Sequence, residues 1–501
     1  MDKIEATFLG HPRGLFLLFF VEMWERFSYY GMRALLIFYL TKHWLFSDGK
    51  SNLIYGAYTA LVYITPAIGG YVADRWLGQR KAVVFGAVLL SFGHILMGFE
   101  GDKATIGLAL NVFWLALAFI IVGSGFLKAN VSVIVGQLYN RTDLRRDSAY
   151  TIFYVGINLG GALGPLIAGY LGETYGWSYG FGAAGLCMVL GLLTFVFGRP
   201  LLQGRGEPTN LMRLQAKTAG FSLERWIYAG GVAMVGLVWL LIQYQSVVGY
   251  LLGVAGAMLL GYVSWIAITT LTRDERDRIF AAIFLMFGVI LFLALFEQAG
   301  SSLNLYTDRF VDRGGIKASL FQSVNSIFII LLGPVLAAVW VWLGKTGWNP
   351  SAPAKFGMSL LQLGFSFLLL VWGAKSAGTA LTPVFFIIAF YFFQTTAELF
   401  LQPVGLSAMN RLAPVHMASL IMGTWFLANA FGEYGASLIA YATGGSGTDG
   451  ALLGKAGYLS VYTTGGWAAI GAGALVLAVS PFIKKLMHLD TLEDEAPRTK
   501  G

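Results

Sequence analysis

The sequence contains few charged residues and almost no cysteine. Only 12% of its 501 residues are charged, whereas soluble domains contain about 25%. The single cysteine, Cys187, rules out an intramolecular disulfide and a cysteine metal site. Five scattered histidines, with no pair at ligand spacing, argue against a metal centre, so we expect no metal and no cofactor. Hydrophobic residues, in contrast, are abundant and make up 57% of the chain, which is typical of a polytopic membrane protein.

Fourteen apolar runs are long enough to cross a bilayer, which takes about 20 residues each. They lie near 15–40, 53–73, 82–99, 105–127, 149–171, 178–198, 225–244, 248–271, 279–300, 319–343, 356–374, 382–403, 417–441 and 456–483. An even number places both termini on one side of the membrane. If that side is the cytoplasm, 23 of the 34 Lys and Arg residues lie in cytoplasmic segments and 8 on the other side. This bias follows the positive-inside rule and explains the net charge of +8 without a nucleic-acid partner.

The longest polar stretch between predicted spans is 201–220, after the sixth span. If the next two spans form an inserted hairpin, six spans follow it. Two six-helix halves around a midplane site are the expected plan of a secondary transporter. We therefore predict an all-α membrane protein with the following parts: an N-terminal six-helix bundle (1–200), a cytoplasmic linker (201–224), an inserted transmembrane hairpin (225–271), a C-terminal six-helix bundle (272–485) and a cytoplasmic tail (486–501).

The first predicted span contains four charged residues: Glu22, Glu25, Arg26 and Arg33. At 100° per residue, all four share one stripe with Tyr29 and Tyr30. A charge in lipid costs at least a few kcal/mol, so such residues normally face a protein interior or a watery cavity. The alternative is a cluster at a helix end that snorkels to the interface. Because Arg33 lies two turns beyond Arg26, the pattern favours a helix that lines a polar path through the membrane.

Further polar or aromatic residues within the spans are candidates for the same path: Tyr63, Lys128, Tyr154, Asn158, Glu297, Asn325, Glu398 and Trp425. Each also has a structural explanation. Lys128 would snorkel to the cytoplasmic surface, Glu297 would be a helix-end carboxylate, Asn325 would hydrogen-bond a neighbouring helix, and the aromatic side chains would pack in the core. Glu398 has apolar residues on both sides, which favours a function.

Several motifs resemble those of known transporters. The segment GGYVADRWLGQRKA, from Gly69 to Ala82, matches the GxxxDRxxGxRK pattern of the major facilitator superfamily. The ExxERFSYYGM segment from Glu22 and FYVGINLGGALGP from Phe153 resemble signatures of the proton-dependent oligopeptide transporters, also called the peptide transporter family. In the second signature, Gly161 replaces the usual serine. FEQAGSSLN from Phe296 and ELFLQPVGLSAMNRLAP from Glu398 resemble two further family segments.

The resemblance implies a major facilitator fold, with twelve core helices plus the two inserted ones, in the plasma (inner) membrane of a bacterium. It also implies a proton-coupled symporter for di- and tripeptides, which is not an enzyme and functions as a monomer. In the family, the matching positions that border the peptide are Tyr29, Arg33, Tyr63, Lys128, Tyr154, Asn158, Asn325, Glu398 and Trp425. Those that take part in proton coupling match Glu22, Glu25 and Arg26.

The residue types suit this task. A peptide is a zwitterion, so its carboxylate would meet Arg33 and Lys128 while its amine would meet Glu398. We also expect two gating salt bridges, Lys128 with Glu398 when the inner gate is closed and Arg33 with Glu297 when the outer gate is closed. The alternatives are the same fold with another small solute, such as nitrate, an amino acid or a peptide-like compound, and an intramembrane enzyme or a channel.

Overall fold

A computed structural model describes residues 7–99, 106–140, 143, 145–444 and 454–489. Within this part of the chain, twelve helices are long and apolar enough to cross a membrane. Two more long helices run beside them: α1 (Arg13–Phe38), which contains the four predicted charges, and α16 (Ala418–Gly444). The prediction of an all-α membrane fold is therefore confirmed: twelve of the fourteen predicted runs are helices of membrane-spanning length and hydropathy, and the other two are the long helices α1 and α16. The described residues also form short two-residue strands.

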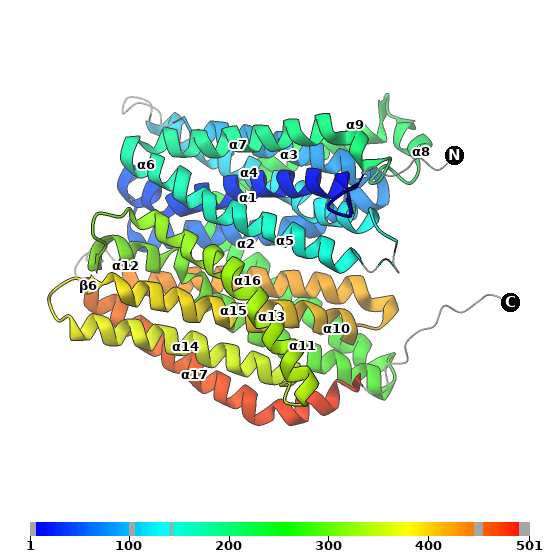
Figure 1. The fold of residues 1–501 in the computed structure, drawn as a ribbon. Helices are drawn as coiled ribbons and strands as arrows, with labels where there is room; N and C mark the ends of the chain where they lie inside the picture. Colours follow the sequence, from blue (N-terminus) through cyan, green and yellow to red (C-terminus); the bar gives the residue numbers. More distant parts are fainter. Residues whose placement is uncertain (1–6, 100–105, 141–142, 144, 445–453, 490–501) are drawn as a thin grey trace.

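The first six long helices pack together as one group (Figure 1). They are α1, α2 (Asp48–Val72), α3 (Gln79–Met97), α4 (Ile106–Gln137), α5 (Arg145–Gly164) and α7 (Trp177–Gly198). Further helical turns prolong three of them: η1 (Tyr39–His43), η2 (Ala73–Leu77), and η4 (Pro165–Gly169) with α6 (Tyr170–Tyr175). We call this set the N group.

The last six long helices form the second group, the C group. They are α11 (Arg273–Phe296), α13 (Ser323–Thr346), α14 (Ala352–Ser376), α15 (Val384–Leu412), α16 and α17 (Gly454–Leu486). Helix α11 continues through η6 (Glu297–Gly300) into α12 (Ser302–Phe310), while η7 (Ala318–Gln322) and η8 (Val415–Met417) precede α13 and α16. Helix α1 begins and α17 ends at the same end of the molecule (Figure 1), which we call the terminal end.

Small residues set the closest helix contacts within each group. A Cβ at Gly160 would collide with the backbone of α1 at Met23, and a Cβ at Gly69 would collide with the Gly125 backbone of α4. In bilayers such small residues let helix backbones approach each other, because the hydrophobic effect does not drive helices together there. The close approach of α2 to α4 is thus made by Gly69, directly before the GxxxDRxxGxRK motif, whereas Gly70, the first residue of the motif, has ordinary spacing to Ala129.

The segment that joins the groups is held against the N group. It comprises η5 (Arg199–Leu202), α8 (Leu211–Gln215) and the antiparallel pair β3 (Lys217–Thr218) and β4 (Phe221–Ser222). The backbone N–H of Arg80 donates to the Gly206 carbonyl at 2.9 Å, and the Arg80 side chain pairs with Glu207. Gly78 adopts a φ of 77° where the Pro208 backbone passes close by, so this position needs glycine. The other strand pairs are β1 (Thr7–Phe8) with β2 (His11–Pro12), and β5 (Val311–Asp312) with β6 (Thr382–Pro383).

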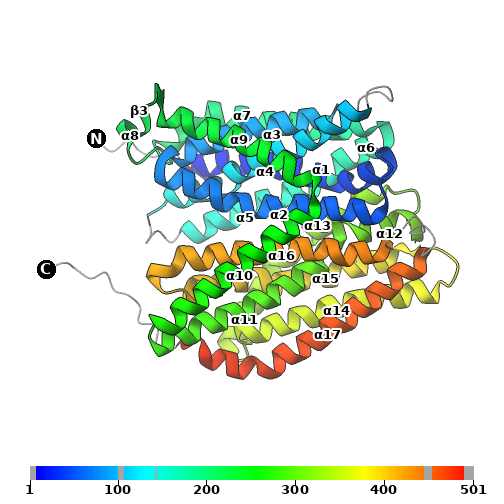
Figure 2. The same ribbon diagram turned by 180° about the vertical axis from the view of Figure 1, so that it is seen from behind.

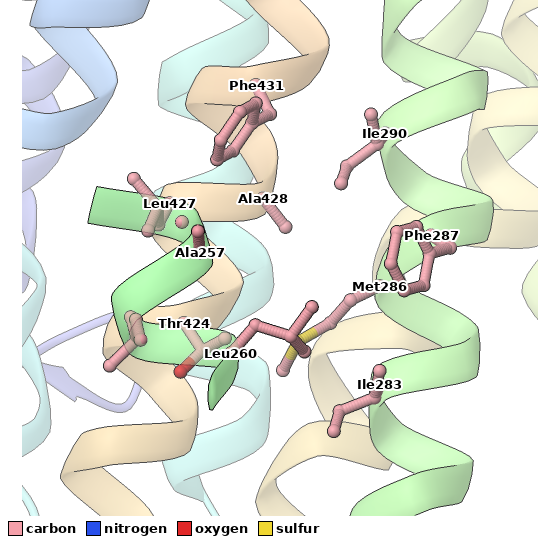
Figure 3. A pocket seen from close by; sticks show the side chains of 12 residues that line it. Ala257, Leu260, Ile283, Met286, Phe287, Ile290, Thr424, Leu427, Ala428 and Phe431 are labelled. Atoms are coloured by element: carbon pink, nitrogen blue, oxygen red, sulfur yellow. The ribbon is translucent and has the colours of Figure 1, made fainter. Parts of the chain in front are cut away.

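The two inserted helices, α9 (Leu223–Gln243) and α10 (Gln245–Thr269), lie outside both groups and diverge from each other (Figure 2). Helix α9 packs on the N group, where Gly231 meets Phe85 and Lys81 Nζ lies 2.7 Å from Glu224. Helix α10 packs on the C group, where Gly256 meets Phe431. Between α10, α11 and α16 an apolar cavity of about 350 Å³ remains (Figure 3).

Candidate functional site

The four charges of α1 are buried between the helices. Arg26 Nε lies 2.8 Å from Glu22 Oε1 and 3.0 Å from Glu25 Oε2. The three residues are at most 5% exposed. One guanidinium therefore serves two carboxylates, an arrangement in which the Arg26 charge offsets only one of the two negative charges.

Lys128 lies beside this triad without a carboxylate within 4 Å among the described residues. Its Nζ atom is 4.4 Å from the ring centroid of Tyr63 and 5.5 Å from that of Tyr29. An ammonium over aromatic faces is stabilised by the ring quadrupole. The expected contact of Lys128 with Glu398 is not formed in this structure.

A cavity of about 140 Å³ separates the N group from the C group near the middle of the helices. The predicted residues that line it are Arg33, Tyr63, Tyr154, Asn158, Glu297, Asn325 and Glu398. The first four come from the N group and the last three from the C group. The cavity therefore presents a cation on one side and carboxylates on the other.

Glu398 is held in this cavity by a neighbouring amide. Asn325 Nδ2 donates to Glu398 Oε2 and to Thr395 Oγ1, both at 3.0 Å. The amide fixes the carboxylate, which has no cation within 4 Å in the described structure. One face of Glu398 thus remains available to a positively charged group in the cavity.

A larger cavity of about 780 Å³ continues from this point to the terminal end. It shares Tyr63 and Tyr154 with the smaller one and also contacts Trp425 and Tyr150. Leu406, near the end of α15, and Val133, near the end of α4, line it as well. The central cavity therefore communicates with the terminal end of the molecule.

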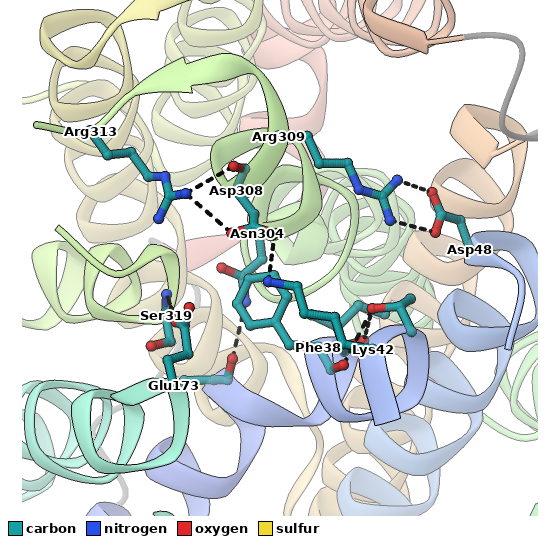
Figure 4. A network of polar contacts seen from close by, with 12 residues as sticks. Phe38, Lys42, Asp48, Glu173, Asn304, Asp308, Arg309, Arg313 and Ser319 are labelled. Atoms are coloured by element: carbon teal, nitrogen blue, oxygen red, sulfur yellow. Dashed lines mark hydrogen bonds and ion pairs between the residues drawn. The ribbon is translucent and has the colours of Figure 1, made fainter. Parts of the chain in front are cut away.

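Ion pairs between the groups close the opposite end. Arg33 of α1 is paired with Glu297 of η6 and also donates to Tyr55. Closer to the surface, both terminal nitrogens of Arg309 donate to the Asp48 carboxylate, and Lys42 Nζ lies 2.7 Å from Asp308 (Figure 4). The contact of Arg33 with Glu297 expected for a closed outer gate is thus formed here.

Backbone contacts add to this closure. Asn304 Nδ2 donates to the Ala34 carbonyl at 3.1 Å, and Glu173 accepts from the Ser319 backbone at 2.9 Å (Figure 4). Asn52 of α2 donates to the Ala440 carbonyl of α16 at 3.0 Å. The cavity is therefore shut at this end and open at the terminal end. The predicted Lys128–Glu398 contact was expected for a closed inner gate, so this open arrangement leaves it a prediction.

Gly161, the departure from the FYxxINxGS pattern, is approached by a hydroxyl from the other group. Ser326 Oγ of α13 would lie 2.7 Å from a Cβ at Gly161. A side chain at position 161 would have to displace it. The absence of a side chain at Gly161 therefore leaves room for the Ser326 hydroxyl of the C group.

One interior carboxylate, Glu433 of α16, is absent from the sequence-based set of candidates. It is 1% exposed and is aligned with Trp425 and Asn429, which line the larger cavity. The signal was available, because Glu433 is a lone carboxylate within the apolar run 417–441. The reasoning that selected Glu398 applies equally to it.

Comparison with known proteins gives a consistent result. The model of the POT family matches residues 80–448. The chain is 36% identical over 498 residues to the uncharacterized transporter YclF of Bacillus subtilis, covering 96% of both chains. It is 34% identical to the peptide transporter YePEPT of Yersinia enterocolitica, with 86% and 88% covered, and to a di-/tripeptide transporter of Lactococcus lactis, with 86% and 89% covered.

Solved structures resemble the whole described fold. A peptide transporter POT variant in complex with alafosfalin superposes with a TM-score of 0.83 at 36% identity, and 97% of both chains is covered. A POT family transporter in complex with 5-aminolevulinic acid superposes with a TM-score of 0.81 at 31% identity, with 96% and 98% covered.

Proposed function

Because the chain belongs to the POT family of transporters, we propose that it imports di- and tripeptides together with protons by alternating access. The protein is a multi-pass membrane protein of a transporter family, and the excess of Lys and Arg supports a cytoplasmic terminal end in the inner membrane of a bacterium. In that orientation the described state is closed to the outside and open to the cytoplasm.

One observation carries the proposal: a single central cavity places Arg33 of the N group opposite Glu398 of the C group. A peptide carboxylate would compete with Glu297 for Arg33, and it would also bind Lys128 once that side chain moves into the cavity, which it does not line in this structure. The peptide amine would bind the free face of Glu398. Because the two ends of a zwitterion would then join the two groups, substrate binding would favour closure of the cavity.

The aromatic walls fit the variable part of a peptide. Tyr63, Tyr154 and Trp425 present large faces with few hydrogen-bonding demands, so they accept side chains of different shape. Asn158 and Asn325 would hydrogen-bond the peptide backbone. This arrangement favours selection of backbone length over side-chain identity.

The triad of Glu22, Glu25 and Arg26 supports proton coupling. Its single cation cannot offset two carboxylates, and an unpaired buried carboxylate is costly unless it is protonated. A proton that moves inward releases about 2.3 kcal/mol per 100 mV and about 1.4 kcal/mol per pH unit. Since about 1.4 kcal/mol corresponds to a factor of ten, one proton is sufficient for at least roughly tenfold accumulation.

A second candidate cargo is a smaller zwitterion, such as an amino acid or a peptide-like compound. A relative of the same fold has been solved in complex with 5-aminolevulinic acid, which also carries one amine and one carboxylate. Simple anions such as nitrate fit less well, because they would leave Glu398 without a partner.

Uptake of labelled dialanine into proteoliposomes tests the proposal. We expect saturable accumulation when an inward proton gradient is imposed and none when a protonophore dissipates it. Competition by tripeptides, single amino acids, 5-aminolevulinic acid and nitrate then ranks the cargoes. Absence of gradient-driven dialanine uptake would contradict peptide symport, and flux that does not saturate would indicate a channel.

A further inference from the structure

Glu433 is the interior carboxylate that the transport scheme above leaves without a role. It lies in the middle of α16 and is 1% exposed. Among the described residues, neither of its oxygens has a hydrogen-bond partner. The Thr59 hydroxyl of α2 faces it but donates to the backbone carbonyls of Tyr55 and Gly56 at 3.2 Å.

The charges around Glu433 do not neutralise it. The ionisable groups of neighbouring elements that interact electrostatically with the Glu433 carboxylate are Tyr29 and Arg33 of α1, Tyr55 and Tyr63 of α2, Lys128 of α4 and Glu297 of η6. Arg33 is already paired with Glu297, and Lys128 lies over aromatic rings. Neither cation is within 4 Å of Glu433 in the described structure.

The interior as a whole also has too many carboxylates. Among the described residues, five interior carboxylates (Glu22, Glu25, Glu297, Glu398 and Glu433) lie near three interior cations (Arg26, Arg33 and Lys128). Buried charges need a partner, and a carboxylate without one is neutralised by a proton instead. Glu433 has no ion pair, and the one hydroxyl that faces it, that of Thr59, already donates to backbone carbonyls. It is therefore the strongest candidate to hold such a proton.

Glu433 lies between the closed end and the open cavity. On the closed side, α2 and α16 are in tight contact, since a Cβ at Gly56 would collide with Ser437. On the open side, Asn429, one turn before Glu433, lines the cavity that leads to the terminal end. Glu433 itself lines neither cavity, so a peptide amine does not reach it, whereas a proton needs only a transient water.

We propose that Glu433 is a second proton-carrying group of the transport cycle, in addition to the Glu22–Glu25–Arg26 triad. This inference rests on the proposed symport function. When α2 and α16 separate at the end away from the termini, a Glu433 oxygen takes a proton from external water and forms an O–H bond. Closure of that contact buries the neutral acid. The O–H bond breaks on the other side, where water in the inner cavity accepts the proton past Asn429.

The first test measures coupling in proteoliposomes. With no membrane potential, each coupled proton raises the limiting accumulation of a neutral dipeptide about tenfold per pH unit of gradient. Glu433→Gln should therefore lower the limiting dialanine accumulation about tenfold at a gradient of one unit, while dipeptide affinity stays within a few-fold. Glu433→Asp, which keeps a carboxyl, should retain the wild-type ratio. Glu207→Gln, the same change at an exposed carboxylate, is the matched control.

The second test does not depend on transport. Infrared difference spectra of the purified full chain at neutral pH should show the C=O stretch of a protonated carboxylic acid in the wild type. Glu433→Gln should lose it, and Glu207→Gln should not. If the band is unaffected by Glu433→Gln, or if this variant accumulates dialanine to the wild-type limit, the inference is wrong. If the wild type shows the band but no proton-driven uptake, both the symport function and the coupling role of Glu433 are wrong. Glu433 would then be a buried, protonated carboxylic acid without a role in transport.

Discussion

The most discriminating prediction concerns Glu297→Gln, which removes the charge partner of Arg33. Both side chains are buried, with Arg33 6% and Glu297 4% exposed. Removal of one partner from a buried ion pair costs about 3–5 kcal/mol, because the other charge stays buried without compensation. In the open outer gate Arg33 would be hydrated, so the penalty falls on the closed state alone. The equilibrium should therefore shift toward outer opening by roughly a hundredfold or more.

Asp48→Asn provides the comparison, because it weakens a more exposed ion pair that joins the groups at the same end. The side chains of Arg309 and Asp48 are 38% and 18% exposed. Ion pairs that water reaches contribute about 0.2–1 kcal/mol. Asp48→Asn should therefore shift the same equilibrium by at most roughly fivefold, although it lies in the same interface.

Spin labels can measure both shifts. Leu45 of the N group and Leu381 of the C group are 79% and 52% exposed at the closed end. After Cys187→Ala, nitroxides on cysteines at these two positions report the separation of the groups by pulsed dipolar spectroscopy. The long-distance population should dominate in Glu297→Gln and change little in Asp48→Asn. Equal effects of the two substitutions, or no effect of Glu297→Gln, would refute the argument from burial.

Three other substitutions test the remaining assignments. Glu22→Gln should lower the limiting proton-driven accumulation of dialanine about tenfold or more per pH unit of gradient yet preserve exchange of peptide for peptide, because exchange does not require the triad to release its proton and take up another; accumulation to the wild-type limit would contradict this role. Glu398→Gln should weaken dipeptide binding in calorimetry by about 1.5–3 kcal/mol, the value of a charged hydrogen bond, but should affect a peptide with a blocked amine far less. Replacement of 225–271 by a short polar linker should leave dipeptide affinity within a few-fold, measured on monodisperse protein; loss of binding would place the inserted helices in the transport core.

Much of this architecture could be predicted from the sequence because a bilayer imposes a simple rule. Apolar runs of about 20 residues become helices, and charges within them turn inward. This rule correctly placed Glu22, Glu25, Arg26 and Arg33 in the interior. It would also have selected Glu433, had each lone intramembrane carboxylate been treated alike.

Other features depend on pairings that local patterns do not contain. The partners Asp48 and Arg309 are 261 residues apart and meet only because two helix ends of different groups converge. Gly69 and Gly70 point in directions about 100° apart on α2. Which of them faces α4 depends on the rotation of α2 about its axis, and the local sequence does not contain that rotation. The divergence of α9 and α10 reflects packing partners on two separate groups.

The packing of the inserted helices has a mechanical consequence. Arg80 and Lys81 of the N group form ion pairs with the linker and with α9. The chain therefore passes from the N group to the C group only after α9, at the turn between Gln243 and Gln245, which is one helix length away from the terminal end. From there α10 runs diagonally back along the C group to α11 (Figure 2). Any rotation of the groups against each other must therefore be accommodated by a change in the tilt of α10, a rigid element in contact with lipid. The apolar void beneath it (Figure 3) gives the middle of this helix room to move, while its first residue is held on α16 by the Tyr434 hydroxyl, which donates to the Gln245 carbonyl at 3.1 Å. We therefore expect a change in bilayer thickness to alter the tilt of α10 and, through it, the joint between the two groups.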